Sequence, residues 1–291
     1  MLRVITPATT SNLGVGFDCL GMSLNIYNRY VFNLTLTKTF ELYGFEEEFN
    51  KDNLVLNAYI ACAKAHGKTD RTIAKISVTL EDKNIPVSRG LGSSASCIIA
   101  GAIAANHYNN LKLTKEEIAK WAADYEGHPD NVYACMFGGL VSIIKEENDY
   151  YFDNLRISKK LRFCIRIPNI QGSTEELRSV LPKKIDMVDA VHNLSRIIHL
   201  PKALEFGEIS LIQKFTEDKY HEQYRAEFIP NYQELKSLAL ENNIVALISG
   251  SGPTMFFIAD EENFSVLLGV SDTADELKSV KIGKGTTLKE F

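Results

Sequence analysis

Residues 86–105 combine glycines, serines and a run of small apolar residues in an order that suits anion binding. Gly90 and Gly92 can adopt backbone angles that other residues avoid, and three serines follow within four positions, at 93, 94 and 96. A helix opening at these serines presents free backbone N–H groups and the positive end of its dipole. The stretch therefore predicts a cradle for nucleotide phosphates, with serine hydroxyls available to a phosphate or a metal ion.

Two known phosphate-binding patterns can be compared with this stretch. A P-loop needs a lysine directly after its second glycine, and none follows Gly92, which excludes it. Residues 90–95 fit the dinucleotide pattern G-x-G-x-x-A, but the preceding residues 81–84 are polar and no acid ends a second strand near Asn110. A glycine turn that only caps a buried helix is the simpler alternative, although Pro86 and the serines favour phosphate binding.

A second unusual stretch reads E-G-H-P-D-N at residues 126–131. It follows a predicted helix that opens with a capping box, Thr114 and Glu117. Two acids, a histidine and an amide thus lie within six residues, beside Gly and Pro. The stretch is either a polar turn between two helices or part of a site.

Two further loops carry the same ambiguity. Residues 8–18 are polar and glycine-rich and include Asn12 and Asp18, so they form either a plain loop or a substrate-facing one. Residues 249–253 read S-G-S-G-P between two apolar segments. They form either a plain hairpin turn or a loop that exposes many N–H groups.

The elements that must position these loops follow from hydrophobic periodicity and from Gly and Pro. Strands are predicted at residues 3–6 (stopped by Pro7), 22–37, 73–80, 140–144, 161–167, 244–248 and 254–259. Helices are predicted at residues 53–66 (capped by Asp52), from Ser93, after Thr114, and at 174–181, 187–200, 204–215 and 231–242, with Pro201 and Pro230 as breaks. Residues 146–154 lack a clear period, so the domain boundary is predicted there, giving segments 1–153 and 154–291.

The composition of the chain argues against several classes of function. The 291 residues are 45% hydrophobic and carry a net charge of −5, so we expect no general affinity for nucleic acid or anionic membranes. The five cysteines are scattered without a C-x-x-C pair, as in reduced proteins, and no signal-peptide pattern is present, which together indicate a cytoplasmic location. The longest apolar run, near residues 95–105, is too short for a membrane span.

Three of these stretches together resemble the motifs of the GHMP kinases, which phosphorylate small molecules such as galactose, homoserine, mevalonate and phosphomevalonate. They are P-A-T-T-S-N-L-G-V-G-F-D at 7–18, P-x-x-x-G-L-G-S-S-A at 86–95 and S-G-S-G-P at 249–253. Within the family, N-L-G-V-G-F-D-C-L-G at 12–21 and E-G-H-P-D-N-V at 126–132 resemble the subfamily that acts on L-homoserine.

The resemblance implies an α+β protein of two domains. The N-terminal one would be similar to the second domain of ribosomal protein S5, and the C-terminal one would be ferredoxin-like, with the active site between them. It also implies ATP and Mg²⁺ as cofactors, and ATP and L-homoserine as substrates. A homodimer is an expectation from the family.

The resemblance assigns roles to the phosphate loop. The residues implied to bind ATP are Pro86, Val87, Ser88, Arg89, Gly90, Leu91, Gly92, Ser93, Ser94, Ala95 and Ser96, with Asn53 as the candidate for the adenine pocket. Backbone N–H groups would replace the missing P-loop lysine. Ser94 and Glu126 are the implied Mg²⁺ ligands, and hard oxygen ligands suit that ion.

Homoserine is a zwitterion with a terminal hydroxyl, and the resemblance implies a partner for each charge. Arg178 and Arg225 match arginines that bind its carboxylate, which guanidinium groups can hold in a bidentate way. Asp18 is the implied acceptor for the ammonium group, with Asn12 and His128 beside the substrate. From the residues alone, both arginines would be expected on the surface.

Asn131 occupies the position at which relatives such as mevalonate kinase carry an aspartate proposed as the base. An amide cannot accept that proton, and the adjacent Asp130 is predicted to face elsewhere because one helical step turns a side chain by about 100°. We therefore expect catalysis by positioning and charge stabilisation, with Asn131 orienting the hydroxyl, Thr174 assisting and the phosphate taking the proton. The alternatives are another GHMP kinase activity, a catalytically inactive sensor and an NAD-binding protein.

Overall fold

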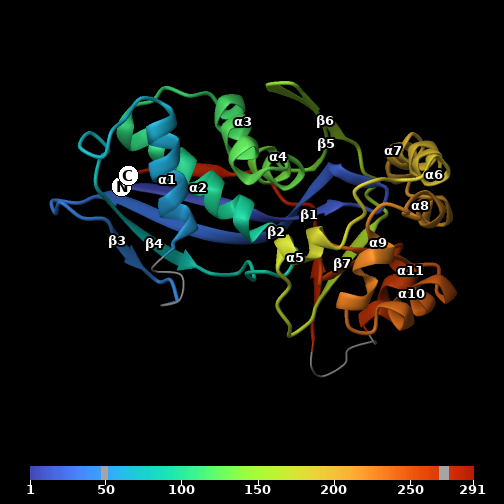
Figure 1. The fold of residues 1–291 in the computed structure, drawn as a ribbon. Coiled ribbons are helices and arrows are strands. Elements are labelled where there is room, and N and C mark those ends of the chain that lie inside the picture. Colours follow the sequence, from blue (N-terminus) through green and yellow to red (C-terminus); the bar gives the residue numbers. More distant parts are fainter. Residues whose placement is uncertain (47–51, 269–274) are drawn as a thin grey trace.

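Two β-sheets form the framework of the chain (Figure 1). The computed structural model describes residues 1–46, 52–268 and 275–291, and of Thr174, Leu267 and Leu268 only the backbone is described. Within these residues the larger sheet has seven strands and the smaller has four. The two-part α+β architecture expected from the sequence is confirmed.

The larger sheet runs in the order β11-β1-β2-β4-β3, and the β5–β6 hairpin pairs with β2. All of its pairs are antiparallel except β3 with β4. Its strands are β1 (Leu2–Asn12), β2 (Gly16–Leu34), β3 (Glu41–Tyr43), β4 (Ile76–Asp82), β5 (Leu140–Glu146), β6 (Asp149–Leu155) and β11 (Thr287–Glu290).

The first strand is longer than predicted, and Pro7 does not end it. The register of β1 against β2 shifts between Pro7 and Ala8, and such a bulge tolerates a residue that has no N–H to donate. The first half of the predicted loop 8–18 is therefore strand, and only residues 13–15 form the turn to β2. The prediction for 146–154 was also incomplete, because most of that stretch forms β6.

Four helices cover one face of this sheet (Figure 1). They are α1 (Leu54–Ala65), α2 (Ser93–Asn109), α3 (Lys115–Glu126) and α4 (Asp130–Phe137). α2 is buried almost all round, and Gly101 lets α1 approach, because a Cβ there would lie 2.3 Å from the Val55 carbonyl oxygen. The capping box of Thr114 and Glu117 is confirmed, whereas the cap of α1 is Asn53 rather than Asp52.

The smaller sheet has the strand order β10-β7-β9-β8 and is antiparallel throughout. Counted along the chain this order is 4-1-3-2, the arrangement of a ferredoxin-like unit. Its strands are β7 (Arg162–Ile167), β8 (Val245–Ile248), β9 (Met255–Ala259) and β10 (Glu276–Val280). The helices of this half are α5 (Thr174–Ser179), α6 (Met187–Ile197), α7 (Leu200–Phe206), α8 (Ile209–Phe215), α9 (Glu222–Arg225), α10 (Tyr232–Glu241) and α11 (Glu261–Leu268), with a short 3-10 turn η2 (Ala226–Phe228).

The single helix predicted at residues 204–215 is wrong. Gly207, with φ of 76°, ends α7, and α8 starts two residues later. Pro201 is not a break, because it lies in the first turn of α7, where a missing N–H costs no hydrogen bond.

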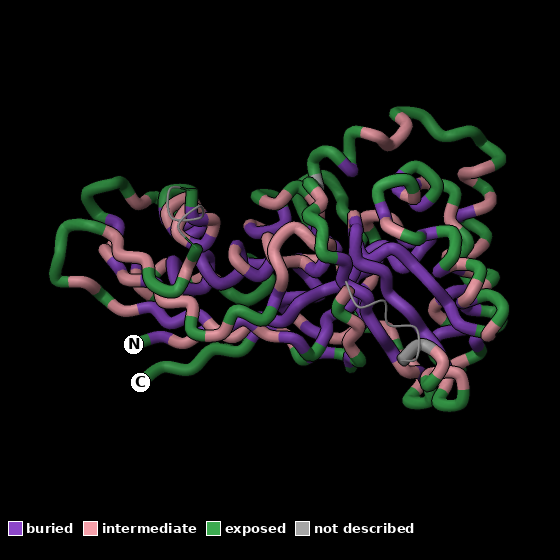
Figure 2. The backbone as a smooth tube through the Cα atoms, turned by 90° about the horizontal axis from the view of Figure 1, so that it is seen from below, coloured by how far each residue is buried: buried purple, intermediate pink, exposed green. Residues whose placement is uncertain are grey.

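The chain crosses between its two halves more than once. Gly283 donates its N–H to Ser23 O (2.9 Å), and β11 then pairs with β1. Both ends of the chain consequently lie side by side, as two views show (Figures 1 and 2). β1, β7, β8 and β9 are largely buried, whereas β11 is exposed. The division at residues 153 and 154 stays a prediction, while the last strand returns to the sheet of the first segment.

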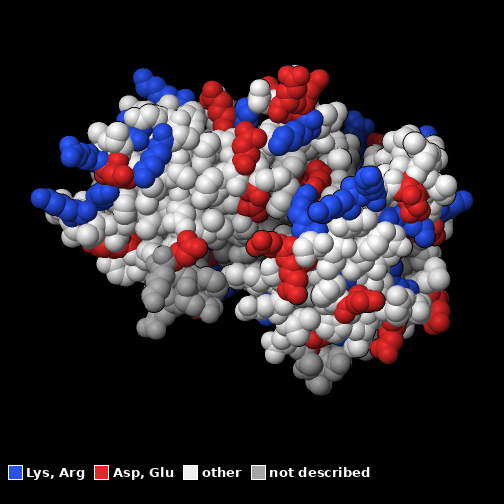
Figure 3. Space-filling view, in the orientation of Figure 1, with Lys and Arg blue, Asp and Glu red and all other residues white. Residues whose placement is uncertain are grey.

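Acidic and basic side chains are distributed over the face drawn in Figure 3, without one broad area of a single sign. Among the described residues, no helix has the length and apolar character needed to cross a membrane. All five cysteines are free; Cys62, Cys135 and Cys164 are buried, and Cys19 is exposed.

Candidate active site

Three segments that are far apart in sequence, the end of β1 and two glycine loops, meet at one point. The Ser249 hydroxyl donates to Gly90 O (2.7 Å) and lies 2.9 Å from Thr10 Oγ1, which can donate to it, and Gly250 N–H donates to Ser11 O (3.2 Å). Gly90 has φ of 72°, and a Cβ there would lie 2.3 Å from the Ser249 carbonyl oxygen. The close contact between the two glycine loops therefore requires glycine at position 90.

A cavity of about 470 Å³ opens beside this junction, a size typical of small-molecule sites. Most residues with a predicted role line it: Asn12, Asp18, Asn53, Val87, Ser88, Arg89, Gly90, Leu91, Gly92, Ser93, Ser94, Glu126, His128, Asn131, Arg178 and Arg225. Pro86, Ala95 and Ser96 lie outside the lining, and the last two are fully buried. The Thr174 side chain lies outside the described part of the structure.

The helix start beside the cavity is open to an anion. Gly92 is the N-cap of α2 with φ of 66°, and no side chain among the described residues caps the helix. The N–H groups of the first turn are therefore not satisfied by a cap. Gly92 itself is packed tightly, since a Cβ there would lie 1.8 Å from Thr9 Oγ1.

Both ends of the phosphate loop are fixed by buried polar side chains. Asn28 accepts the N–H groups of Asn84 (2.8 Å) and Ile85 (2.9 Å) just before the loop, and it donates to Tyr30 Oη (3.2 Å). The Tyr30 hydroxyl lies 3.1 Å from Ser96 Oγ, in the first turn of α2. Ser96 thus supports the loop from behind, and Asn28 is a supporting residue that the sequence analysis missed.

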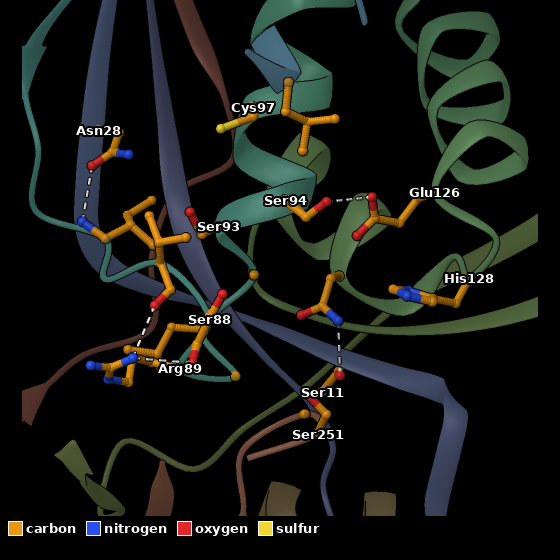
Figure 4. Close-up of a pocket in the computed structure, with 18 of the residues that line it drawn as sticks. Ser11, Asn28, Ser88, Arg89, Ser93, Ser94, Cys97, Glu126, His128 and Ser251 are labelled. Atoms are coloured by element: carbon orange, nitrogen blue, oxygen red, sulfur yellow. Dashed lines mark hydrogen bonds between the residues drawn. The ribbon is translucent and has the colours of Figure 1, made fainter. Parts of the chain in front are cut away.

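Ser94 and Glu126 face each other across the cavity wall, as Figure 4 shows. The Ser94 hydroxyl donates to Glu126 Oε2 at 2.7 Å. Burial raises the pKa of Glu126, an effect that the nearby His128 partly offsets. In the described part of the chain no cluster of three or more His, Cys, Asp or Glu could hold a metal by itself. A cation held here would therefore complete its shell with phosphate oxygens and water, as Mg²⁺ commonly does.

Asn53 contributes both to a helix and to the cavity wall. Its Oδ1 accepts the N–H of Leu56 (3.1 Å) and so caps α1, while the residue is 4% exposed and lines the cavity. Leu54, Tyr30 and Phe45 line the same cavity, together with the charged Glu46, Asp52 and Lys83. Another part of the lining, the charged end, includes Asp18, Arg178 and Arg225.

The charged end is formed by two arginines around one aromatic ring. Arg225 is 2% exposed and donates from Nε to Leu177 O (3.0 Å) and from Nη1 to Gly250 O (3.2 Å). Burial lowers the pKa of Arg225 to about 10, with a further contribution from Arg178, and the group stays charged at neutral pH. The Phe17 ring centroid lies 5.6 Å from Arg225 Cζ and 5.5 Å from Arg178 Cζ.

Asp18 is held beside these arginines by a short chain of contacts. It has φ of 57°, and its backbone N–H donates to Asn12 Oδ1 (3.1 Å). Asn12 in turn donates from Nδ2 to Gly250 O (2.8 Å). The polar atoms of Asn12 are thus engaged within the protein, and they tie the position of Asp18 to the 249–253 loop.

The Asn131 side chain is fixed by hydroxyls from β1. Thr9 Oγ1 donates to Asn131 Oδ1 (2.7 Å), and Asn131 Nδ2 donates to Ser11 Oγ (3.0 Å). Both hydroxyls come from the first motif. Asn131 Nδ2 also lies 3.2 Å from Asp130 Oδ1, a carboxylate oxygen that accepts its N–H, and this contact gives the amide one preferred orientation. Ser11 also lines the cavity and was not singled out from the sequence.

The prediction that Asp130 faces away from the site is wrong. Asp130 lines the cavity, accepts the N–H of Asn131 (2.7 Å) and lies 3.5 Å from His128 Nδ1. It is the first residue of α4, where a side chain can fold back over the helix start, so a rotation of about 100° does not separate it from its neighbour. Burial alone would lower the pKa of His128, but the adjacent Asp130, with Glu126 and Asp18, raises it.

Comparisons with known proteins agree with this geometry. Residues 53–139 match the GHMP kinases N terminal domain, and residues 201–267 match GHMP kinases C terminal. A protein named homoserine kinase from Clostridium beijerinckii is 37% identical over 90% of this chain and 88% of its own length. A protein of the same name from Clostridium botulinum strain 657 is 35% identical over 96% of this chain and 93% of its own length.

Solved structures show the same fold. A homoserine kinase from Cytophaga hutchinsonii superposes with a TM-score of 0.81 at 24% identity, covering 99% of this chain and 97% of that one. A putative homoserine kinase from Listeria monocytogenes gives a TM-score of 0.79 at 24% identity over the full length of both chains.

Proposed function

Since the chain belongs to the GHMP kinase family, we propose that it phosphorylates the hydroxyl of L-homoserine with ATP. The products are O-phospho-L-homoserine and ADP, which places the reaction in threonine biosynthesis. The observation that carries this proposal is that one cavity is lined both by an open helix start and by Asp18, Arg178 and Arg225. The identity of 35–37% to relatives named homoserine kinase supports the choice of substrate.

ATP is assigned to the end of the cavity formed by residues 87–94 and Asn53. The uncapped first turn of α2 offers backbone N–H groups to the phosphates, and its dipole favours their negative charge. The aromatic and aliphatic walls around Tyr30 and Leu54 suit the base. This division of the cavity places the terminal phosphate near Ser94 and the neighbouring Asn131.

The residues that would hold Mg²⁺ are Ser94 and Glu126. A hydroxyl and a carboxylate 2.7 Å apart at the phosphate end form a hard-oxygen donor pair that fits this ion. When bound, the ion would neutralise charge on the transferring phosphoryl group. Glu126 has to be ionised for this role, and its raised pKa makes that requirement sensitive to pH.

L-Homoserine is assigned to the charged end. Arg225 and Arg178 suit its carboxylate, and Asp18 suits its ammonium group. Asp130, a buried carboxylate beside His128, adds a second acceptor for the ammonium group. These contacts hold the acceptor hydroxyl on the side of the cavity that faces the phosphate loop.

Because Asp130 is assigned to the ammonium group, the proton of the attacking hydroxyl has no strong base among the proposed catalytic residues. Asn131 would orient the hydroxyl through its amide, which Thr9 and Ser11 hold in place. Rate enhancement would then come from positioning and charge stabilisation, with the phosphate accepting the proton. A contribution from Thr174, a homodimer and a cytoplasmic location stay predictions from the sequence.

The test is Mg²⁺-dependent ADP release from ATP with L-homoserine, measured beside mevalonate, L-serine and L-threonine. Activity confined to L-homoserine is the expected result. Activity with another alcohol would retain the phosphate end and contradict the assignment of Arg178, Arg225 and Asp18. ATP binding without turnover of any alcohol would favour a sensor instead.

A further inference from the structure

His221 is a fully buried histidine at the edge of the charged end, and the proposed function gives it no role. Its Nε2 lies 2.9 Å from Gly14 O, in the turn between Asn12 and Asp18. Its Nδ1 lies 3.2 Å from Arg225 Nη1. One imidazole ring thus joins the loop of the first motif to the arginine assigned to the substrate carboxylate.

The two hydrogen-bond partners of His221 determine which ring nitrogen carries the hydrogen. A carbonyl oxygen can only accept, so Nε2 carries the hydrogen that is donated to Gly14 O. A guanidinium can only donate, so Nδ1 presents its lone pair to Arg225. His221 in this arrangement is therefore the neutral Nε2–H tautomer, with both nitrogens in use.

The acid near this ring serves the backbone. Asp218 Oδ2 accepts the N–H groups of His221 (2.6 Å) and Glu222 (2.8 Å), at the start of α9. Asn193 Nδ2 donates to the other oxygen, Asp218 Oδ1 (2.7 Å). This anchors the backbone of His221. Asp218 Oδ2 also lies 3.8 Å from His221 Nε2, beyond hydrogen-bond distance, so the hydrogen bonds of the ring go to Gly14 and Arg225.

The orientation of Arg225 depends on His221. Its Nε is used by Leu177 O, and its Nη1 is shared between Gly250 O and His221 Nδ1. Among the described residues nothing accepts from Nη2, so that group is available to a ligand in the cavity that Arg225 lines. Removing the acceptor at Nδ1 would leave a buried N–H of Nη1 incompletely satisfied and would loosen the guanidinium.

The loop on the other side of the ring is closely docked. Gly14 has φ of 74°, and a Cβ there would lie 2.2 Å from Thr216 O, so the turn packs directly on the end of α8. The ring centroid of Phe17 lies 5.4 Å from that of His221. The distance between Asp18, which follows Phe17, and Arg225 is therefore set through this contact region.

We propose that His221 is a positioning residue that holds Arg225 and the Gly14 turn at a fixed spacing. The carboxylate and the ammonium group of one α-amino acid then meet their partners at the same time. This inference rests on the proposed function, because it assigns the charged end to an amino acid. It predicts that changes at His221 alter the affinity for L-homoserine and spare ATP.

Two amide variants separate the contacts of the ring. In His221→Gln the amide reaches the position of Nε2 and can donate to Gly14 O, but no acceptor remains for Arg225. In His221→Asn the amide oxygen occupies the position of Nδ1 and can accept from Arg225, while the link to Gly14 is lost. We expect the KM for L-homoserine to rise about tenfold in the Gln variant and about threefold in the Asn variant. The kcat and the KM for ATP should stay within about twofold.

The control is His199→Gln, a change at an exposed histidine of the same half that should alter none of these constants. Thermal melting shows which variants fold. If one amide variant does not fold, the KM expected for the other still tests the inference. Equal changes in kcat and in both KM values, or an unchanged KM for L-homoserine, would overturn the inference and leave the proposed function intact. A wild-type enzyme inactive on L-homoserine would overturn the proposed function, and this inference with it.

Discussion

Asp18 and Arg178 form a two-pronged ion pair across the charged end of the cavity, although they are 160 residues apart in the chain. Arg178 Nη1 donates to Asp18 Oδ1 (3.4 Å), and Nη2 donates to Oδ2. Both side chains are partly exposed, so the pair contributes only about 0–1 kcal/mol to stability. A zwitterionic substrate can replace it by pairing its carboxylate with Arg178 and its ammonium group with Asp18.

Because of this exchange, we expect substitutions at Asp18 and Arg178 to weaken substrate binding and to change the stability of the protein little. Asp18→Asn and Arg178→Gln should each raise the KM for L-homoserine by about tenfold or more, because each removes one charge that the zwitterion needs. The free energy of unfolding should change by less than about 1 kcal/mol in both. Steady-state kinetics and urea unfolding measure the two quantities. A large loss of stability with an unchanged KM would contradict the exchange.

Asn131→Asp tests whether the enzyme lacks a strong base. A carboxylate at position 131 loses the hydrogen bond that the amide donates to Ser11 and lies close to Asp130, whose Oδ1 is now 3.2 Å from Asn131 Nδ2. Like charges at this distance repel, so we expect turnover of L-homoserine to fall about tenfold. An increase of several-fold would show that the site accepts a base and that catalysis by positioning alone is wrong. Asn131→Ala, which removes the amide without adding a charge, is the matched comparison.

Glu126 gives a prediction about pH. Because burial raises its pKa, the carboxylate becomes protonated at a higher pH than an exposed glutamate, and a protonated carboxyl binds cations poorly. The apparent affinity for Mg²⁺ should therefore weaken as the pH falls through this raised pKa. In Glu126→Gln the affinity should be at least about tenfold weaker and the acidic limb should disappear. Mg²⁺ titrations of the initial rate at several pH values measure both effects.

The ionised carboxylate of Glu126 should favour activity and, at the same time, lower the stability of the ligand-free protein. A carboxyl whose folded-state pKa lies above its unfolded value binds more protons when folded, so the stability it contributes is present at low pH and lost as the pH rises through the folded-state pKa. At neutral pH the ionised Glu126 therefore destabilises the ligand-free protein. Glu126→Gln should raise the melting temperature measured without Mg²⁺ while reducing activity. A lowered melting temperature would show that the hydrogen bond from Ser94 outweighs the cost of burial.

The sequence predicted which segments come together better than it predicted the folding details around them. Motif resemblance identified the loops that meet at Gly90 and Ser249, since glycine spacing and residue type are local properties of the chain. It gave the wrong orientation for Asp130, because that orientation depends on where α4 begins. It also gave no role for His221, whose partners Gly14 and Arg225 lie in different segments.

The fold errors have a similar cause. Pro7 was expected to end a strand, but a bulge in the pairing with β2 accommodates it, and such a register shift is set by the partner strand. The return of β11 to β1 is a contact between the two ends of the chain, which no local pattern encodes. By contrast, the capping box at Thr114 involves residues three apart and was predicted correctly.

Gly90 and Gly67 offer a matched pair for testing the junction of the two glycine loops. Both have positive φ, 72° and 83°, so an alanine at either position carries a similar backbone strain of about 1 kcal/mol. They differ in surroundings: a Cβ at Gly90 would lie 2.3 Å from Ser249 O, whereas a Cβ at Gly67 would meet nothing described within 4 Å. Gly90→Ala must therefore push the phosphate loop away from the 249–253 loop, and Gly67→Ala need not move anything.

We expect Gly90→Ala to raise the KM for ATP at least about tenfold and to lower kcat, because the displaced loop no longer presents its N–H groups at the phosphate position. Gly67→Ala should lose about 1 kcal/mol of stability and keep the kinetic constants of the wild type. Comparing the two variants separates the steric effect at the junction from the cost of positive φ. If both lose the same stability and both keep the wild-type KM for ATP, the contact between Gly90 and Ser249 does not determine the position of the phosphate loop.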